Sequence, residues 1–336
     1  MSIKKKTVLA AVIAVILLIA SCLLAIMCGS YSMSVERVVA TLLGHGNKAE
    51  NMAVLQIRLP RMVIAILVGI AISASGCILQ TITRNPLAEP GMIGLNAGAS
   101  LAVVLYLTLR RSAYYEVISV NKVIFMPMIA MIGGILTSML VLAISYRKGL
   151  APIRLILVGI GINSGINAII TYYMLTSSKG DYNEVLTWTN GSLWGSSWIY
   201  VALVAPVILI LVFIVMAKGR VLDVMQLGDD MAIGLGVQPK KELLFFFFLA
   251  AMLAAVGTSV AGNIAFLGLL GPQLAKRIVG SRHHLLIPFG GILSAIILIL
   301  ADTAARNLFS PIEIPVGIAV SIIGIPYFIY LLLKEK

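Results

Sequence analysis

Long runs of apolar residues dominate this sequence and restrict it to a small set of folds. A helix needs roughly 20 apolar residues to cross the hydrocarbon core of a bilayer, and its backbone polar groups must be satisfied inside that core. The runs therefore predict an all-α, polytopic membrane protein with about ten transmembrane helices. They lie near residues 8–28, 60–82, 92–109, 123–145, 154–175, 198–217, 242–260, 262–279, 286–304 and 315–333.

The composition agrees with a membrane protein. Of the 336 residues, 60% are hydrophobic and only 11% are charged, and the mean hydropathy is +1.05, which is too little charge to cover a soluble surface. We interpret residues 1–336 as a single transmembrane domain. The first run follows Lys4, Lys5 and Lys6 and is too long for a signal-peptide core, which favours a retained helix over a cleaved signal.

Charge predicts the orientation in the membrane. An even number of spans places both termini on one side, and most of the 25 Lys and Arg residues lie at span ends on that side. The positive-inside rule then makes both termini cytoplasmic. The formal net charge of +12 fits attraction to anionic lipid. Nucleic acid is excluded as a partner because the chain has no soluble basic domain.

Residues 218–241 form a long polar interruption in the second half of the chain, predicted to be cytoplasmic. Asp229 and Asp230 can accept hydrogen bonds at the start of a short helix, and Gly236 can end that helix in a left-handed conformation. Apolar side chains lie between them. An ordinary amphipathic connector and a surface offered to another protein both fit. The residues of interest are Leu227, Gly228, Asp229, Asp230, Ala232, Gly234, Leu235 and Gly236.

The fifth run carries a polar stripe. Gly159, Asn163 and Asn167 are spaced four apart, with Ser164 beside them, so they share one face of an apolar helix. Such a stripe either bonds to a neighbouring helix or lines a watery path. Both interpretations remain open.

Arginines mark the external side of the predicted spans. Arg58 and Arg61 flank Pro60. They either extend to the membrane interface or offer cations to a carboxylate-bearing partner. Asp302 and Arg306 are four residues apart, a spacing that allows an intrahelical salt bridge.

Other chemistry-bearing residues predict structural roles. Trp188, Trp194 and Trp198 indicate an aromatic belt, with a substrate-stacking site as the alternative. The cysteines Cys22, Cys28 and Cys77 have no metal-ligand spacing. The pair His283 and His284 favours solvated surface over a metal site, and we predict no metal site in this chain.

The sequence shows no energy source of its own. It contains neither a phosphate-binding loop nor a catalytic motif, and its acidic residues lie at span ends or in loops, unlike those of many ion-coupled transporters. We therefore expect a transporter that is not an enzyme and borrows its energy from a partner. A stand-alone secondary transporter is the alternative.

Many segments in a fixed order resemble the FecCD transport family, the permease subunits of importers for ferric siderophores, haem and cobalamin. The matching segments are Arg58-Leu-Pro-Arg61, SGCILQ and RNPLAEPGMIGLNAGA in 75–99, WTNGSLWG (188–195), LGDDMAIGLGV (227–237), GNIAFLGLLGPQLAKRIVGSRHH (262–284), LADTAAR (300–306), PIEIPVGI (311–318) and IGIPYFIYLLL (323–333). The resemblance covers the chain nearly end to end.

The resemblance implies a permease in the bacterial cytoplasmic membrane, with a second permease subunit identical to it or related. Two cytoplasmic ATPase subunits would hold ATP and Mg²⁺ and contact the 227–236 residues named above, while this chain binds no cofactor. A substrate-binding protein outside the membrane would dock on Arg58, Arg61 and Arg306. The fifth span would line the path for the cargo, a ferric siderophore ahead of haem or cobalamin. The stretch Ala151-Pro152-Ile153 lacks the small hydroxyl residues of some members, so we assign no gate there.

Overall fold

The computed structural model describes residues 3–29, 33–110, 120–146, 152–176, 179–308 and 313–334. All regular elements in these ranges are helices. The short elements include a π-helical and a 3₁₀ segment, η1 and η2. The elements are α1 (Ile3–Met27), α2 (Val35–Leu42), α3 (Lys48–Asn51), η1 (Met52–Arg58), α4 (Leu59–Thr83), η2 (Pro90–Ile93), α5 (Leu95–Arg110), α6 (Val120–Ser145), α7 (Pro152–Thr176), α8 (Lys179–Thr189), α9 (Trp198–Ala217), α10 (Gly219–Met225), α11 (Asp229–Gly234), α12 (Pro239–Ala261), α13 (Leu267–Val279), α14 (His283–Asn307) and α15 (Val316–Lys334).

The all-α, polytopic prediction is confirmed. Eight helices in the described ranges are long and apolar enough to cross a membrane, and the shorter apolar helices α5 and α13 match the two remaining predicted runs. The structure places α2 before the second span and α8 before α9. The helix of the second span starts at Lys48, where α3 begins, and not near residue 60 as predicted. Ala151, at the position without an assigned gate, lies outside the described residues.

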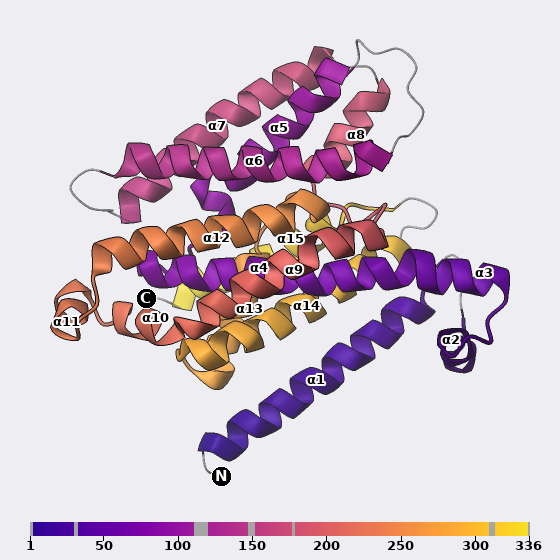
Figure 1. Ribbon diagram of the computed structural model, residues 1–336, viewed down its shortest axis with the longest axis horizontal. Coiled ribbons are helices and arrows are strands. Elements are labelled where there is room, and N and C mark those ends of the chain that lie inside the picture. Colours follow the sequence, from indigo (N-terminus) through magenta and orange to yellow (C-terminus); the bar gives the residue numbers. More distant parts are fainter. Residues whose placement is uncertain are drawn as a thin grey trace.

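Helix α4 is the centre of the bundle. It packs against α12, α13 and α14, and most of its side chains are buried. Figure 1 shows the long helices running side by side, with both chain ends and the pair α10 and α11 at one end of the molecule and α2 and α3 at the other. The shared side of the two termini agrees with an even number of spans.

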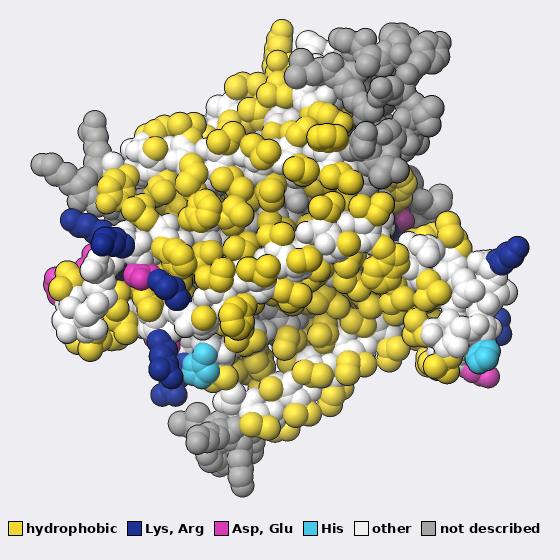
Figure 2. Space-filling view, viewed as in Figure 1, with side chains coloured by type: hydrophobic (Ala, Val, Ile, Leu, Met, Phe, Trp, Pro, Cys, Tyr) yellow, Lys and Arg dark blue, Asp and Glu magenta, His cyan; other side chains and the backbone are white. Residues whose placement is uncertain are grey.

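The surface has the pattern of a membrane protein. Apolar side chains cover the middle of the face shown in Figure 2, and charged side chains gather at its two ends. Helices α1, α7, α9 and α15 expose many large aliphatic side chains. Lipid can solvate such side chains but cannot hydrogen-bond to an open backbone.

Two connections outside the α-helices pack between the helices of the bundle. Residues 84–94 join α4 to α5, and residues 262–266 join α12 to α13. Their backbones pack tightly: a Cβ atom on Gly191 would lie 2.3 Å from the carbonyl oxygen of Asn263, and one on Gly159 would lie 1.9 Å from that of Met92. Helices α4 and α13 approach as closely, since a Cβ atom on Gly76 would lie 1.8 Å from the carbonyl oxygen of Gly268. Irregular backbone is tolerated at membrane depth only when protein covers it or it lines a cavity. Glycine has no side chain, so a neighbouring backbone can approach closely enough to provide that cover.

Replacing Gly76 with alanine therefore tests the packing. We expect Gly76→Ala to lower the free energy of unfolding by about 1–3 kcal/mol, the usual cost of overpacking. The measurement is thermal unfolding of the detergent-solubilised chain. Gly219→Ala is the matched control, because the nearest described atom to its Cβ position is 3.6 Å away, an ordinary contact. Equal melting temperatures for the two variants would contradict the close approach of α4 and α13.

Candidate functional site

The segment 218–241 forms a compact projection at the end of the molecule that carries both termini. Lys218 Nζ lies 2.8 Å from each carboxylate oxygen of Glu242 and 4.3 Å from the centre of the Phe245 ring. This ion pair joins the two ends of the segment. Between them, α10 and α11 form a pair of short helices at the left of Figure 1.

The predicted end of α11 is confirmed, and the helix begins at the predicted aspartates, but their predicted hydrogen bonds to its first N–H groups are not found. Gly236 has φ +81° and donates its N–H to Ile233 O, while Val237 donates to Ala232 O, each at 2.9 Å; this is the Schellman pattern. At the start, Gly228 is the N-cap without a side-chain hydrogen bond. Asp229 pairs with Arg84 instead, because the end of α4 lies beside it.

Helix α11 presents an apolar surface outward. Ala232 is buried against the chain, while Asp229, Asp230, Gly234 and Gly236 are exposed and Gly228 is partly buried. The large apolar side chains of this surface are 58–61% exposed; they are Leu227, Met231, Ile233 and Leu235. Figure 1 places α11 beyond the ends of the spans. An apolar cluster at such a position is typical of a protein contact.

The polar stripe of α7 faces the connection 84–94. Asn163 donates to Gly91 O at 3.0 Å, and Gly159 provides the close approach to Met92 described above. Asn163 and Asn167 line an open cavity of about 520 Å³. Ser164 is exposed on another side of α7 and does not line it.

The cavity wall is weakly polar. Its polar lining residues come from five parts of the chain and are Glu89, Asn96, Ser100, Asn163, Asn167, Thr171, Thr189 and Asn263; methionine, isoleucine, alanine and glycine supply the rest. Asn96 donates to Asn263 Oδ1, which connects α5 with the connection 262–266. Amides can donate or accept, so this wall can contact varied polar groups.

Glu89 lies in the cavity wall and was not predicted from the sequence. Its Oε2 atom accepts the N–H of Phe266 at 2.9 Å, and Phe266 has the left-handed φ of +64° at the start of α13. Burial raises the pKa of the Glu89 carboxyl, although the Phe266 bond acts in the opposite direction. Pro90 and Gly91 signal a turn but not its depth, so local sequence could not locate this carboxyl in the cavity wall.

The three predicted docking arginines gather at the opposite end of the molecule. Arg61 binds Asp302 through Nε and Nη2, at 3.0 and 2.8 Å, and reaches Glu313 at 3.1 Å. Arg58 donates to Ile26 O, and Arg306 donates to carbonyl groups at the end of α1. Cations suit a helix C-terminus. Docking by these residues stays a prediction, and each of them also holds helices of its own chain together.

Two predictions in this chemistry are wrong. Asp302 pairs with Arg61 on another helix and not with Arg306, whose Nη2 atom is directed to Ala25 O and Cys28 O. Extension of Arg61 to the interface is also wrong, since only 8% of the residue is exposed. A spacing of four residues permits a pair, but a partner from another helix satisfied the carboxylate more completely.

The histidine pair divides between two environments. His284 is exposed as predicted, whereas His283 is fully buried and bonded to Asp223 and Thr81. The solvated-surface prediction is therefore wrong for His283. Among the described residues, no group of three or more His, Cys, Asp or Glu could hold a metal ion.

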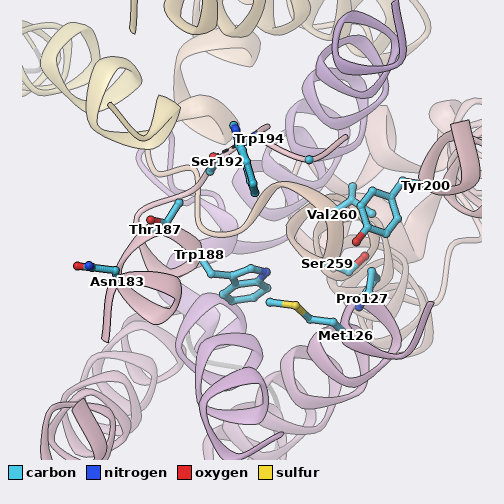
Figure 3. A pocket seen from close by; sticks show the side chains of 11 residues that line it. Met126, Pro127, Asn183, Thr187, Trp188, Ser192, Trp194, Tyr200, Ser259 and Val260 are labelled. Carbon is cyan, nitrogen blue, oxygen red and sulfur yellow. Dashed lines mark hydrogen bonds between the residues drawn. The ribbon is translucent and has the colours of Figure 1, made fainter. Parts of the chain in front are cut away.

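The aromatic residues also have two roles. Trp194 and Trp198 are exposed, as an interfacial belt requires. Trp188, Trp194 and Tyr200 line a second pocket of about 430 Å³ between α6, α8, α9 and α12. Figure 3 shows the Trp188 ring beside Met126, with Tyr200 across the pocket. Trp194 is both exposed and part of the pocket lining, so the choice between an aromatic belt and a stacking site stays a prediction.

Comparison with known proteins defines the class. A family model described as the FecCD transport family matches residues 17–334. The chain therefore belongs to the FecCD transport family. Its helices agree with a solved structure described as an inward-facing conformation of a metal-chelate type ABC transporter, with a TM-score of 0.81, 26% identity, and coverage of 96% of this chain and 97% of the other.

Curated relatives are similar along most of their length. The iron(3+)-hydroxamate import system permease protein FhuG of Bacillus subtilis (strain 168) is 42% identical over 293 residues, 87% of either chain. The Fe(3+)-citrate import system permease protein YfmE of the same organism is 38% identical, with coverage of 99% of this chain and 97% of that one. The chain is thus similar to permease proteins of iron import systems.

The Arg61–Asp302 pair gives a direct test of the external cluster. We expect Asp302→Asn to lower the free energy of unfolding by about 3 kcal/mol, because Arg61 would keep a buried charge with one partner fewer. Thermal unfolding in detergent measures the change. Glu313→Gln is the control, since that side chain is 37% exposed and exposed pairs contribute about 0–1 kcal/mol. Equal effects of the two variants would contradict a structural role for the pair.

Proposed function

We propose that this chain is the permease subunit of an ATP-driven importer in a bacterial cytoplasmic membrane, and that it forms the path for a ferric siderophore. Haem and cobalamin are the next cargo classes. The family membership and the names of the iron-import relatives support the proposal. The observation on which it most depends is the exposed apolar surface of α11, at the end that carries both termini.

Two cytoplasmic ATPase subunits are the proposed partners of α11. A capped helix with outward apolar side chains does not stabilise its own chain but offers a partner buried area. The partners would hold ATP and Mg²⁺, so the catalysis of hydrolysis lies outside this chain. The ion pair of Lys218 with Glu242 supports this proposal, because it holds the two ends of the segment 218–241 together. A displacement of α11 would then move the whole segment.

A second permease subunit is proposed to cover α7. Gly161 and Gly165 are four residues apart, and no described residue of this chain lies within 4 Å of their Cβ positions. This spacing permits close helix contact in membranes. Leu157 and Tyr172 are exposed on the same helix. The cavity beside Asn163 and Asn167 would then become a path between two subunits.

Alternating access is the mechanism that we propose. Closure of the ATPase subunits would displace α11 and tilt the helices around the cavity. The weakly polar cavity wall supports transient contacts with cargo, and a substrate-binding protein outside the membrane would provide affinity. If that protein docks on Arg58, Arg61 and Arg306, its carboxylates would have to replace some of the bonds that these arginines make within their own chain.

A stand-alone secondary transporter is the alternative, with Asp302 as its coupling group. The bond of Asp302 to Arg61 engages both carboxylate oxygens, so a coupling ion would have to displace the Arg61 guanidinium group. The Arg61–Asp302 bond therefore favours the importer over the secondary transporter.

Charge placed on the α11 surface tests the proposal. We expect Met231→Asp and Ile233→Asp to reduce recovery of a P-loop ATPase with the tagged, detergent-solubilised chain at least about tenfold, since desolvating a carboxylate in an apolar contact is costly. The measurement is quantitative mass spectrometry after purification from the native membrane. Gln238→Asp, at an exposed position of the same segment, adds the same charge outside the apolar surface.

Recovery of the ATPase with the unchanged chain and with Gln238→Asp, but not with the two α11 variants, is the expected result. A chain that carries no ATPase yet transports iron chelates would overturn the proposed importer. Equal recovery with all variants would show that α11 is not the ATPase contact.

A further inference from the structure

His283 occupies a buried junction between the projecting segment and the bundle. It is the first residue of α14 and has no exposed surface. Its backbone N–H donates to Asp223 Oδ1 at 2.9 Å, and its Nδ1 atom lies 2.7 Å from the same oxygen. On the other side of the ring, Nε2 lies 2.7 Å from Thr81 Oγ1. The ring thus joins α10, α14 and α4.

The hydrogen-bond partners of His283 determine which ring nitrogen carries the hydrogen. A carboxylate oxygen only accepts, so the hydrogen of the neutral imidazole is on Nδ1 and is donated to Asp223. Nε2 is then an acceptor for the one Thr81 hydroxyl hydrogen, for which Cys77 O, 2.9 Å from Thr81 Oγ1, competes. Gln226 of the 218–241 segment lies 3.4 Å from Nε2 as a weaker donor. Both ring nitrogens are engaged, so a shift of Asp223 displaces His283 and alters its contact with Thr81.

Thr81 connects the His283 junction to the wall of the cavity beside α7. Thr81 lies near the end of α4, just before the connection 84–94 that contributes Glu89 to the cavity wall. Asp223 lies in α10, which packs on α11. Gly219, at the start of α10, lies with its Cβ position 3.6 Å from His283 Cβ. The junction therefore lies between the apolar α11 surface and the cavity.

We propose that Asp223, His283 and Thr81 form a relay that transmits displacement of the segment 218–241 to α4, with His283 as its positioning residue. The proposal rests on the proposed function, because the displacement would come from an ATPase bound to α11. The Arg84–Asp229 pair connects the same two parts, but its side chains are 48% and 67% exposed, and water weakens exposed pairs. The relay is less exposed, with His283 fully buried and the Asp223 side chain 33% exposed, and is therefore the stiffer connection.

The test uses the complex of this chain with its co-purified ATPase, reconstituted in lipid nanodiscs. Two readouts are taken: the rate of ATP hydrolysis, and the ATP-induced change in maleimide labelling of Thr171→Cys, a cavity-lining position, with the native cysteines replaced. We expect Thr81→Val and His283→Asn to reduce the labelling response about threefold or more, within the range of measured couplings, while hydrolysis continues. A purely structural defect would lower hydrolysis and recovery of the complex instead.

Thr83→Val is the matched control. Thr83 is equally buried in α4 and bonds only to Leu79 O of its own helix, at 2.6 Å, so its loss removes a hydroxyl but no connection between helices. Equal labelling responses for Thr81→Val and Thr83→Val would overturn the relay. If the unchanged chain recovers no ATPase, the proposed function fails, and the relay fails with it. If the unchanged complex responds and the variants respond equally, the relay fails alone.

Discussion

The need to hydrogen-bond every backbone group within the membrane controls this structure. Helices meet that need internally, so the departures from helix at 84–94 and 262–266 are the informative places. There the chain substitutes close backbone packing, as at Met92 against Gly159, and bonds to side chains, as from the Phe266 N–H to Glu89. Both departures contribute to the cavity beside α7. The irregular backbone that requires protein cover is thus also the backbone that supplies polar groups to a path.

Helix α4 connects the two ends of the molecule. At one end, Arg61 is fixed to Asp302 of α14; at the other, Thr81 contacts His283, and Arg84 pairs with Asp229. A stiff, buried helix with defined partners at each end moves with its neighbours and does not bend freely. This arrangement suits a transporter in which an event on one side of the membrane must change contacts on the other.

The sequence predicted the spans well because the relevant signal is local: a run of apolar residues long enough to cross lipid behaves alike in most surroundings. The Gly236 helix end was also predictable, because it depends on one backbone position. Pairing between distant segments was not. Asp302 and Arg306 have the spacing for a pair, yet Arg61, 241 residues away, is the partner, and the burial of His283 depends on Asp223 and Thr81. Local patterns do not encode which helices become neighbours.

The central claim is that partner ATP hydrolysis drives transport through this chain. The most direct measurement is uptake of a ⁵⁵Fe-labelled ferric hydroxamate, ferric citrate or haem into liposomes that hold the chain with its co-purified ATPase and binding protein. The account predicts uptake of at least one of these cargoes that requires ATP on the ATPase side and persists when ion gradients are collapsed. Uptake that needs an ion gradient and continues without ATP or the ATPase would contradict it.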